Sequence, residues 1–438
     1  MKNKLNRIAK DTNQFLKKLL LITFLTFLSS PAFADVNNGD TAWILTSTAL
    51  VLFMTLPGLA LFYAGLVSSK NVVSVLMQHF ALACVVSIIW VILGYSLAFS
   101  PGNAWIGDLS NLFMKSINID SVSGTVPESL FATFQMTFAI ITPALIIGAF
   151  VERIKFSAML IFISLWVIIV YSPVTHWVWG GGILSSWGTM DFAGGIVVHA
   201  TAGTAALVTA LTLGKRRGFP KSIIPPHSPI LTMIGAAMLW IGWFGFNGGS
   251  ALGANGGAGM AMLVTHISAA TASLVWMFIE WRRFGKPSLI GIVTGMVAGL
   301  ATVTPASGYI GVPGALILGF FGGLLCYLAV DYIRGKLKID DSLDVFAVHG
   351  VGGILGSLLV AFLATPTFSG LGLPDGQTAS SQFIVQFKAV ALTVVWTTVF
   401  TYLILKITSF IVPLRVDEEE EIEGLDLRSH GEKGYHSD

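Results

Sequence analysis

Two histidines lie deep inside apolar stretches of the sequence and share a local pattern. His199 and His349 each follow a valine and each precede a glycine by four residues, and Asp191 and Asp341 stand eight residues before them. In the second copy, Asp344 is a nearer acid. Ionisable side chains at bilayer depth are costly, and they usually face a bundle interior or a cavity. The pair is therefore the first candidate for function.

Two buried imidazoles favour a small polar guest. Burial keeps each ring neutral, so each has one N–H donor and one acceptor nitrogen. The rings can hydrogen-bond to each other and still present edges to a guest. A hydrated metal ion is excluded, because the sequence has neither an acidic ring nor a carbonyl filter motif such as TVGYG.

Polar and aromatic groups elsewhere could complete a pathway. Phe134–Phe138 (FQMTF), His176–Trp179 (HWVW) and Trp240–Ser250 combine rings with amide and hydroxyl groups. Aromatic faces backed by a hydroxyl suit a small cation that donates hydrogen bonds. Close helix packing is the alternative explanation for the glycines of the last segment. An interfacial aromatic belt is the alternative for the tryptophans of the second.

Three other histidines and both cysteines receive a structural interpretation. A lone buried histidine is more often a hydrogen-bonded core residue than a working one, and we expect this of His79, His176 and His266. Cys84 and Cys326 lie in apolar runs without a Cys/His cluster. We therefore expect small buried residues there rather than a disulfide or a metal site.

The composition is that of a polytopic membrane protein. Of the 438 residues, 54% are hydrophobic and 11% are charged, and the mean hydropathy is +0.78. These values lie well outside the usual range of soluble domains. The net charge of +2 is dispersed over short loops, which excludes a nucleic-acid partner.

Residues 1–34 have the pattern of a secretory signal peptide. A basic start precedes a short apolar core at 19–28, and an A-x-A cleavage motif ends at residue 34. We expect the mature chain to begin at Asp35, with an uncleaved amphipathic anchor as the alternative. The signal and the composition of the tail suggest a bacterial inner membrane.

Runs of about twenty apolar residues predict an all-α fold of eleven transmembrane helices. The expected spans are 42–66, 74–99, 128–150, 156–178, 193–213, 229–249, 255–280, 287–304, 308–332, 343–364 and 384–412. Loops after the odd-numbered spans carry thirteen Lys or Arg residues, against two elsewhere, Lys115 and Lys388. The positive-inside rule then places the mature N-terminus outside and the C-terminus in the cytoplasm.

Eleven spans divide as five, five and one. An odd number of spans per half gives the halves opposite orientations, and such inverted repeats place a site near the midplane. We expect a first half at about 42–213, a second at about 229–364, a peripheral eleventh helix at about 384–412 and a cytoplasmic tail at 413–438. The histidines then lie in the last span of each half.

Several stretches resemble the Amt/Mep/Rh family of ammonium transporters, on its bacterial Amt branch. DFAGGIVVH (191–199), DVFAVHG (344–350) and WFGFNGGS (243–250) are similar to family motifs, and the likeness extends from ALVLFMTLPGLALFYAGL (49–66) to GLDLRSHGEKGY (424–435). One departure is Pro143, where a smaller residue is expected and the third helix could change locally.

The resemblance implies a role for individual residues. His199 and His349 correspond to twin histidines of a hydrophobic pore, and Phe138 and Phe246 to a stacked gate. Trp179 and Ser250, with Phe138, correspond to an outer ammonium site. Asp191 corresponds to a supporting acid near that site, and Trp243, from the motif at 243–250, is taken as a second supporting residue.

The resemblance also implies partners and a setting. Ammonium or ammonia is the substrate, with methylammonium as an analogue, and the expected assembly is a homotrimer in membrane lipid, serving nitrogen uptake without a cofactor. The acidic run 417–421 is by itself typical of a solvated segment, but the tail that follows is similar to one implicated in contact with PII-type regulators.

Two other functions fit the sequence less well. An ammonium sensor shares these pore residues but normally carries a signalling domain, and the roughly 25 residues after the last span are too few for one. An intramembrane hydrolase would use a motif such as HExxH or GxSxG, and this sequence contains neither.

Overall fold

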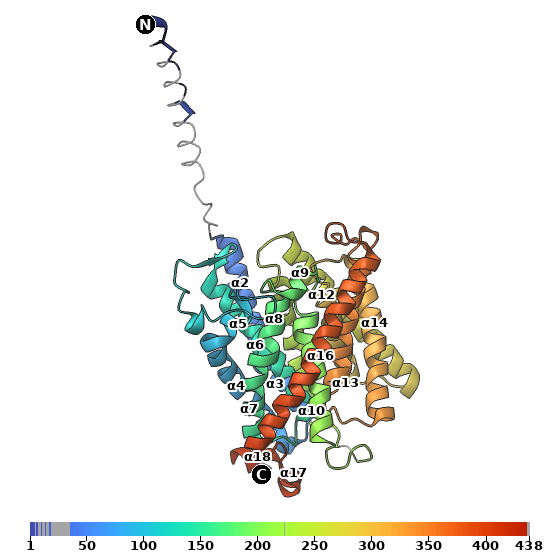
Figure 1. Ribbon diagram of the computed structural model, residues 1–438. Helices are drawn as coiled ribbons and strands as arrows, with labels where there is room; N and C mark the ends of the chain where they lie inside the picture. Colours follow the sequence, from blue (N-terminus) through green and yellow to red (C-terminus); the bar gives the residue numbers. More distant parts are fainter. Residues whose placement is uncertain are drawn as a thin grey trace.

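The computed structural model describes residues 36–222 and 224–435, together with 1–4, 6, 7, 10, 14, 17 and 18. The expected apolar core and cleavage site of the signal peptide lie outside these residues. The described chain forms one bundle of long helices that run side by side, with α16 (Ala379–Ile411) crossing its outer face (Figure 1).

The prediction of an all-α polytopic membrane protein is confirmed. In the described residues, ten helical segments are long and apolar enough to span a membrane. They are Asn38–Leu66, Ser69–Phe99, Glu128–Phe150, Phe156–Ser186, Gly195–Leu213, Pro229–Gly248, Gly256–Phe284, Val312–Leu337, Phe346–Leu363 and Ala379–Ile411. The expected eighth span is the shorter apolar helix α13 (Leu289–Val303). The helix order therefore matches the eleven predicted spans.

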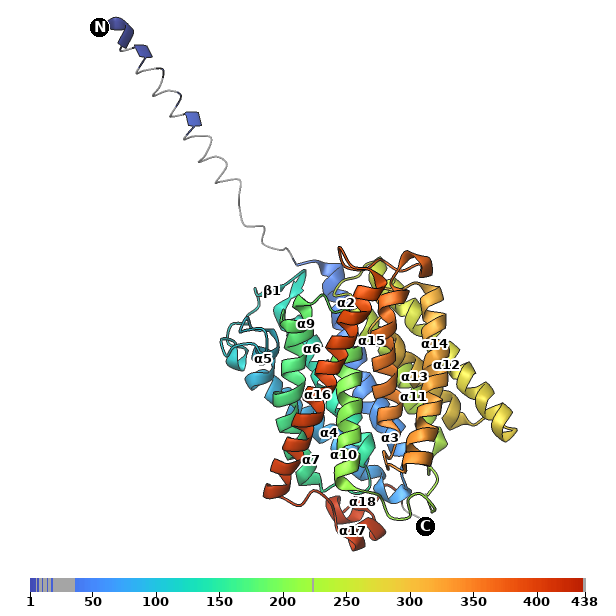
Figure 2. The same ribbon diagram turned by 45° about the vertical axis from the view of Figure 1, so that its right-hand side comes forward.

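Most of these spans are built from more than one element. The α-helical pieces are α2 (Asn38–Phe53), α3 (Ala60–Leu66), α4 (Val72–Ile89), α5 (Tyr95–Phe99), α6 (Glu128–Phe150), α7 (Phe156–Trp166), α8 (Ser172–Val178), α9 (Ile183–Ser186), α10 (Thr201–Leu213), α11 (Pro229–Trp243), α12 (Gly256–Phe284), α14 (Val312–Val330) and α15 (Val351–Leu363). The lower end of α12 projects away from the bundle (Figure 2). The 3₁₀ turn η2 (Ser69–Asn71) begins the second span. Outside the spans lie the 3₁₀ turns η4 (Leu112–Met114) and η10 (Pro366–Phe368), and a small hairpin of β1 (Val122–Ser123) and β2 (Val126–Pro127).

Single π-helical turns lie within the spans or at their ends. They are η1 (Met54–Leu59), η3 (Trp90–Gly94), η5 (Val167–Tyr171), η6 (Gly195–Ala200), η7 (Phe244–Gly248), η8 (Asp331–Leu337) and η9 (Phe346–Gly350). Such turns are rare and often occur at functional sites. Three of them carry residues singled out from sequence, namely His199 on η6, Phe246 on η7 and His349 on η9.

Pro143 leaves the third span unbroken. The helix α6 continues from Glu128 to Phe150 with Pro143 inside it. The expected local change in this helix is thus not a break, and Phe138 stays on a continuous helix.

The glycines of the histidine pattern bring the two halves together. A Cβ on Gly203 would lie 2.3 Å from the Gly350 Cα atom, and a Cβ on Gly353 would lie 2.5 Å from the His199 Cβ atom. Each half therefore presents a glycine to the histidine segment of the other. Contact this close requires a residue without a side chain, which explains why the glycine recurs four residues after each histidine.

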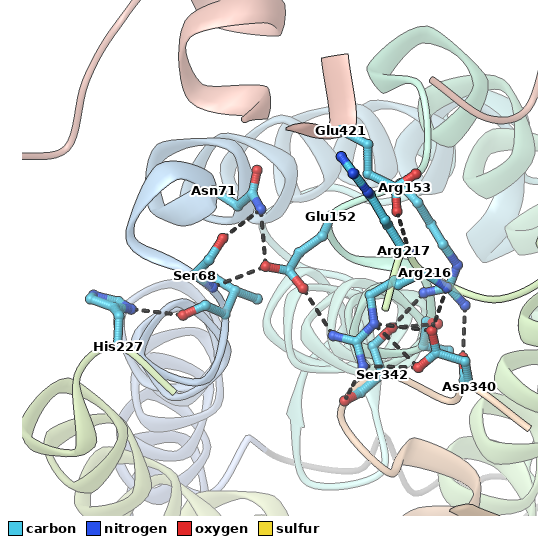
Figure 3. A network of polar contacts seen from close by, with 12 residues as sticks. Ser68, Asn71, Glu152, Arg153, Arg216, Arg217, His227, Asp340, Ser342 and Glu421 are labelled. Carbon is cyan, nitrogen blue, oxygen red and sulfur yellow. Dashed lines mark hydrogen bonds and ion pairs between the residues drawn. The ribbon is translucent and has the colours of Figure 1, made fainter. Parts of the chain in front are cut away.

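A polar network joins the loops at the end of the bundle that the positive-inside rule predicts to be cytoplasmic (Figure 3). Arg216 pairs with Glu152 at 2.9 Å and with Asp340 at 2.8 Å. Arg153 is fully buried and donates to the Asp340 carbonyl at 2.7 Å and to Ser342. Burial opposes the charged form of Glu152, but the Arg216 charge and the hydrogen bonds from Ser68, Asn71 and Arg216 together outweigh it and hold the pKa of Glu152 below its usual value.

The tail folds back onto this network. It forms α17 (Glu418–Glu423) and α18 (Leu425–His430) at the lower face of the bundle (Figure 1). Asp426 accepts the backbone N–H of Ser74 at 2.7 Å, and Asn71 accepts that of Leu425 at 2.8 Å. The acidic run is only partly solvated, because Glu421 pairs with Arg415 at 2.8 Å.

Candidate functional site

The two histidines meet at the centre of the bundle. The Nδ1 atoms of His199 and His349 lie 3.3 Å apart, and the rings stack at an angle of 17°. Both side chains are buried. Because one hydrogen bond needs one proton, one Nδ1 donates and the other accepts. When both rings are neutral, one Nε2 is then an acceptor and the other a donor.

Asp191 fixes the first histidine segment. Its carboxylate accepts four backbone N–H groups, at 2.6 to 3.1 Å, from the residues 194–197 that start η6. A helix start leaves such N–H groups without partners, and a carboxylate there satisfies them. In the second half Asp341 accepts the N–H of Phe346 at 2.7 Å, at the start of η9. The two aspartates of the pattern therefore hold the two histidine segments.

A narrow apolar cavity of about 10 Å³ adjoins the histidines. This volume is about the minimum that can hold one water molecule. The lining combines both rings with aliphatic and aromatic groups, namely Leu59, Phe62, Ile141, Leu145, Val198, Leu239, Trp243, Phe246 and Val297. We call this space the lumen. A guest inside it meets few polar groups other than the imidazoles.

Two phenylalanines separate the lumen from a wider cavity. The ring centroids of Phe138 and Phe246 lie 4.3 Å apart, and both side chains are buried. Phe246 lines the lumen, whereas Phe138 lines the wider cavity. With these rings in place, no guest passes from one space to the other unless they move.

The wider cavity, called the outer cavity here, has a volume of about 280 Å³. It is lined by Phe99, Phe131, Gln135, Phe138, Val178, Trp179, Phe192, Ser250 and Leu252. The Trp179 indole N–H donates to the Asp191 carbonyl at 2.9 Å. The Ser250 hydroxyl donates to the Phe246 carbonyl at 2.8 Å. Both donors are thus engaged, which leaves the indole face and the hydroxyl oxygen available to a cation.

Trp243 supports the lumen from the side. Its ring stacks on His199 with centroids 5.5 Å apart and an angle of 18°, and its N–H donates to the Thr304 hydroxyl at 2.9 Å. The hydrogen bond fixes the indole, and the indole limits the His199 ring to one orientation.

A third space opens below the histidines. This inner vestibule, of about 130 Å³, shares Phe62, Val297 and His349 with the lumen. An ion pair of Arg334 with Asp344, at 2.7 Å, lies on its wall. In the sequence, Asp344 is an acid near His349, and Arg334 is one of the thirteen loop cations. No spacing in the sequence indicated that they would pair.

The structure brings together the eight residues to which the sequence assigned a role at the site, namely Phe138, Trp179, Asp191, His199, Trp243, Phe246, Ser250 and His349. The lining residues that the sequence does not indicate are mainly apolar, such as Phe99, Phe131 and Leu239. An apolar residue in an apolar span carries no signal that distinguishes a lining position from a packed one.

The expectation of a buried core position is confirmed for two of the three other histidines. His176 is a satisfied core residue, with its ring nitrogens 3.0 Å from the Ala98 carbonyl and 2.7 Å from the Asn103 carbonyl, and His79 is buried. The expectation was wrong for His266, which is exposed on the outside of α12 against Trp240.

The expectation of a buried position is confirmed for one cysteine and wrong for the other. Both are free, as expected, but Cys84 is exposed while Cys326 is buried. Side chains that face lipid are apolar, as core side chains are, so hydropathy did not distinguish the two positions. Among the described residues, no group of three or more His, Cys, Asp or Glu residues could hold a metal ion.

The tryptophans of the second aromatic segment do not form an interfacial belt. Trp177 is fully buried and donates its N–H to the Trp105 carbonyl at 2.7 Å. Trp179 lines the outer cavity. Both therefore face protein rather than lipid headgroups.

Comparison with known sequences adds an independent finding. A model of the Ammonium Transporter Family matches residues 42–435. The chain is 46% identical over 404 residues to the "Ammonium transporter" of Bacillus subtilis (strain 168), covering 91% of this chain and 99% of that protein. It is also 46% identical over 420 residues to the "Ammonium transporter" of Aquifex aeolicus (strain VF5), covering 94% and 97%.

Solved structures share the fold. The crystal structure of Candida albicans Mep2 superposes with a TM-score of 0.81 at 35% identity, covering 88% of each chain. A structure described as "Sensor Amt Protein" superposes with a TM-score of 0.84 at 28% identity, covering 90% of this chain and 98% of the other. The helical bundle is therefore similar to that of these solved structures.

Proposed function

The chain belongs to the ammonium transporter family, and on that premise we propose that it takes ammonium from the outer cavity and conducts ammonia past His199 and His349. It is a multi-pass membrane protein of a transporter family rather than an enzyme. The observation that carries the proposal is the small lumen lined by two hydrogen-bonded histidines and closed on its outer side by the packed, tilted rings of Phe138 and Phe246.

Recruitment takes place in the outer cavity. The faces of Trp179 and Phe138 attract a cation through their ring quadrupoles. The Ser250 hydroxyl oxygen accepts one N–H from the same guest. The orientation of the Trp179 ring is fixed, because its indole N–H donates to the backbone carbonyl of Asp191.

Loss of a proton follows from the size and dryness of the lumen. Potassium resembles ammonium in size and charge, so charge alone cannot separate the two ions. A charged guest without its water is expensive in an apolar space, and a lumen of about 10 Å³ has no room for a hydration shell. Ammonium can lose its charge by giving up a proton, whereas potassium cannot.

The histidines then serve a neutral guest. Ammonia both donates and accepts hydrogen bonds, and a neutral imidazole pair offers one free acceptor and one free donor nitrogen. The Nε2 atom of His199 has no partner within the described part of the chain, so it is available to the guest. Imidazole is also able to relay a proton.

The cellular setting is part of the proposal. The protein lies in the cytoplasmic membrane with its mature N-terminus outside and its C-terminus inside, as the thirteen loop cations support. It assembles as a homotrimer. The docked tail and the polar network of Figure 3 offer a face to a PII-family regulator.

Uptake of labelled methylammonium by cells that lack their own ammonium transporters tests this function. Expression of the chain should restore uptake, and unlabelled ammonium should compete. Membrane insertion is verified by detecting the protein in the membrane fraction. A correctly inserted chain that moves neither ion contradicts transport and favours an ammonium sensor instead.

A further inference from the structure

The outer cavity contains a polar side chain that the recruitment step above does not use. Gln135 lines this cavity and is only 7% exposed. Its Oε1 atom is buried and has no hydrogen-bond partner among the described residues. Buried side-chain amides normally have partners, and one that has none calls for an explanation such as a ligand.

Gln135 and Phe138 lie on the same face of α6 and line the same cavity. Residues three and four apart share one face of a helix, so Phe131, Gln135 and Phe138 form one stripe along α6, and all three line the cavity. Ser250 and Trp179 reach the cavity from other elements. The amide therefore faces a space that already offers a hydroxyl oxygen and two aromatic faces.

Ammonium has four N–H groups, and the outer cavity then has four groups to receive them. Trp179 and Phe138 supply two ring faces, and Ser250 supplies one oxygen. The Gln135 oxygen is buried in the structure, but a side-chain amide can turn either its carbonyl oxygen or its NH₂ group toward a neighbour. A turn of the amide toward the cavity therefore supplies a second oxygen. We propose that Gln135 is a specificity-determining residue of the outer cavity, whose amide oxygen accepts the fourth N–H of ammonium.

This proposal rests on the recruitment step and adds selectivity to it. Methylammonium has three N–H groups and must place its methyl group against one of the four positions. A methyl group against either oxygen leaves that oxygen without a partner, which is costly in a buried site, and a methyl group against a ring face removes one N–H group from the cation–π contact. The wild-type cavity should therefore prefer ammonium to methylammonium.

Gln135→Met tests the proposal, because methionine keeps the length of the side chain and removes the amide. We expect the KM for ammonium to rise about tenfold, as for loss of one hydrogen bond to a charged donor. The KM for methylammonium should rise less, so the preference for ammonium narrows. Gln135→Glu should act in the opposite direction, lowering the KM and slowing turnover, because a carboxylate holds the cation more strongly.

Gln78→Met is the matched control. Gln78 is 1% exposed and also has a buried Oε1 without a partner in the described residues, but it does not line the outer cavity. Its substitution should leave both KM values unchanged. An unchanged KM for ammonium in both Gln135 variants overturns the inference. An equal rise in the KM for ammonium and for methylammonium in Gln135→Met overturns it as well. A wild-type chain that transports neither substrate contradicts the transport function instead.

Discussion

The Nδ1 atoms of His199 and His349 lie 3.3 Å apart, although 150 residues separate them in sequence. Because one hydrogen bond joins the rings, the two side chains act as a unit, and their substitutions should not be additive. We expect His199→Ala and His349→Ala each to reduce the ammonium-evoked current about tenfold or more, and the double variant to lose little beyond that.

Current recordings from purified protein in liposomes measure this effect. His266→Ala is the control, because that histidine is exposed on α12 and does not line the lumen. Currents and ion selectivity that stay at wild-type values in both single variants would show that protons do not use the imidazoles.

Trp179→Leu should weaken recruitment without changing the lumen. A desolvated cation–π contact contributes about 1–2 kcal/mol, so we expect the KM for ammonium to rise about tenfold. Trp281→Leu serves as the control, since Trp281 is half exposed and lies outside the outer cavity. Initial uptake rates over a range of ammonium concentrations separate the KM from the maximal rate. A fall in the maximal rate alone contradicts a role in recruitment.

The packing of the two halves depends on Gly203. Its Cβ would lie 2.3 Å from the Gly350 Cα atom, and overpacking of this kind typically costs about 1–3 kcal/mol. We therefore expect Gly203→Ala to lower the melting temperature in detergent and to disturb the histidine pair. Gly259→Ala is the matched control, because nothing lies within 4 Å of a Cβ there. Equal melting temperatures for the two variants would contradict the close approach.

Asp341 should make stability depend on pH near neutrality. Burial and the charge of Asp344 raise the pKa of Asp341 to about 7, although backbone N–H groups and Arg334 partly oppose this. A carboxyl whose pKa is raised on folding binds its proton more tightly in the folded state, so stability falls as the pH rises from about 4 to about 7. In Asp341→Asn, which mimics the protonated form, the melting temperature should vary less between pH 5 and pH 8. A pH profile that is identical in the variant argues against this titration.

The sequence predicted the helices and the lining better than the contacts between distant segments. Hydropathy located the eleven helical segments, because the lipid requires long apolar runs. It did not reveal the π-helical turns at His199, Phe246 and His349, since these depend on packing between segments. Nor did it show that Arg216 would join Glu152 to Asp340, because no local pattern pairs loops that are 64 and 124 residues apart.

The docked tail gives a final prediction. Asp426 caps the start of α4 by accepting the Ser74 N–H at 2.7 Å, and loss of such a cap costs about 0.5–2 kcal/mol. Because this contact joins α18 to the bundle, Asp426→Ala should loosen α18 and speed tryptic cleavage at Arg428 several-fold. Glu432→Ala is the control, since Glu432 is an exposed acid in the same tail. Cleavage that is equally slow in both variants would mean that the remaining contacts, such as that of Asn71 with Leu425, are sufficient to hold the tail.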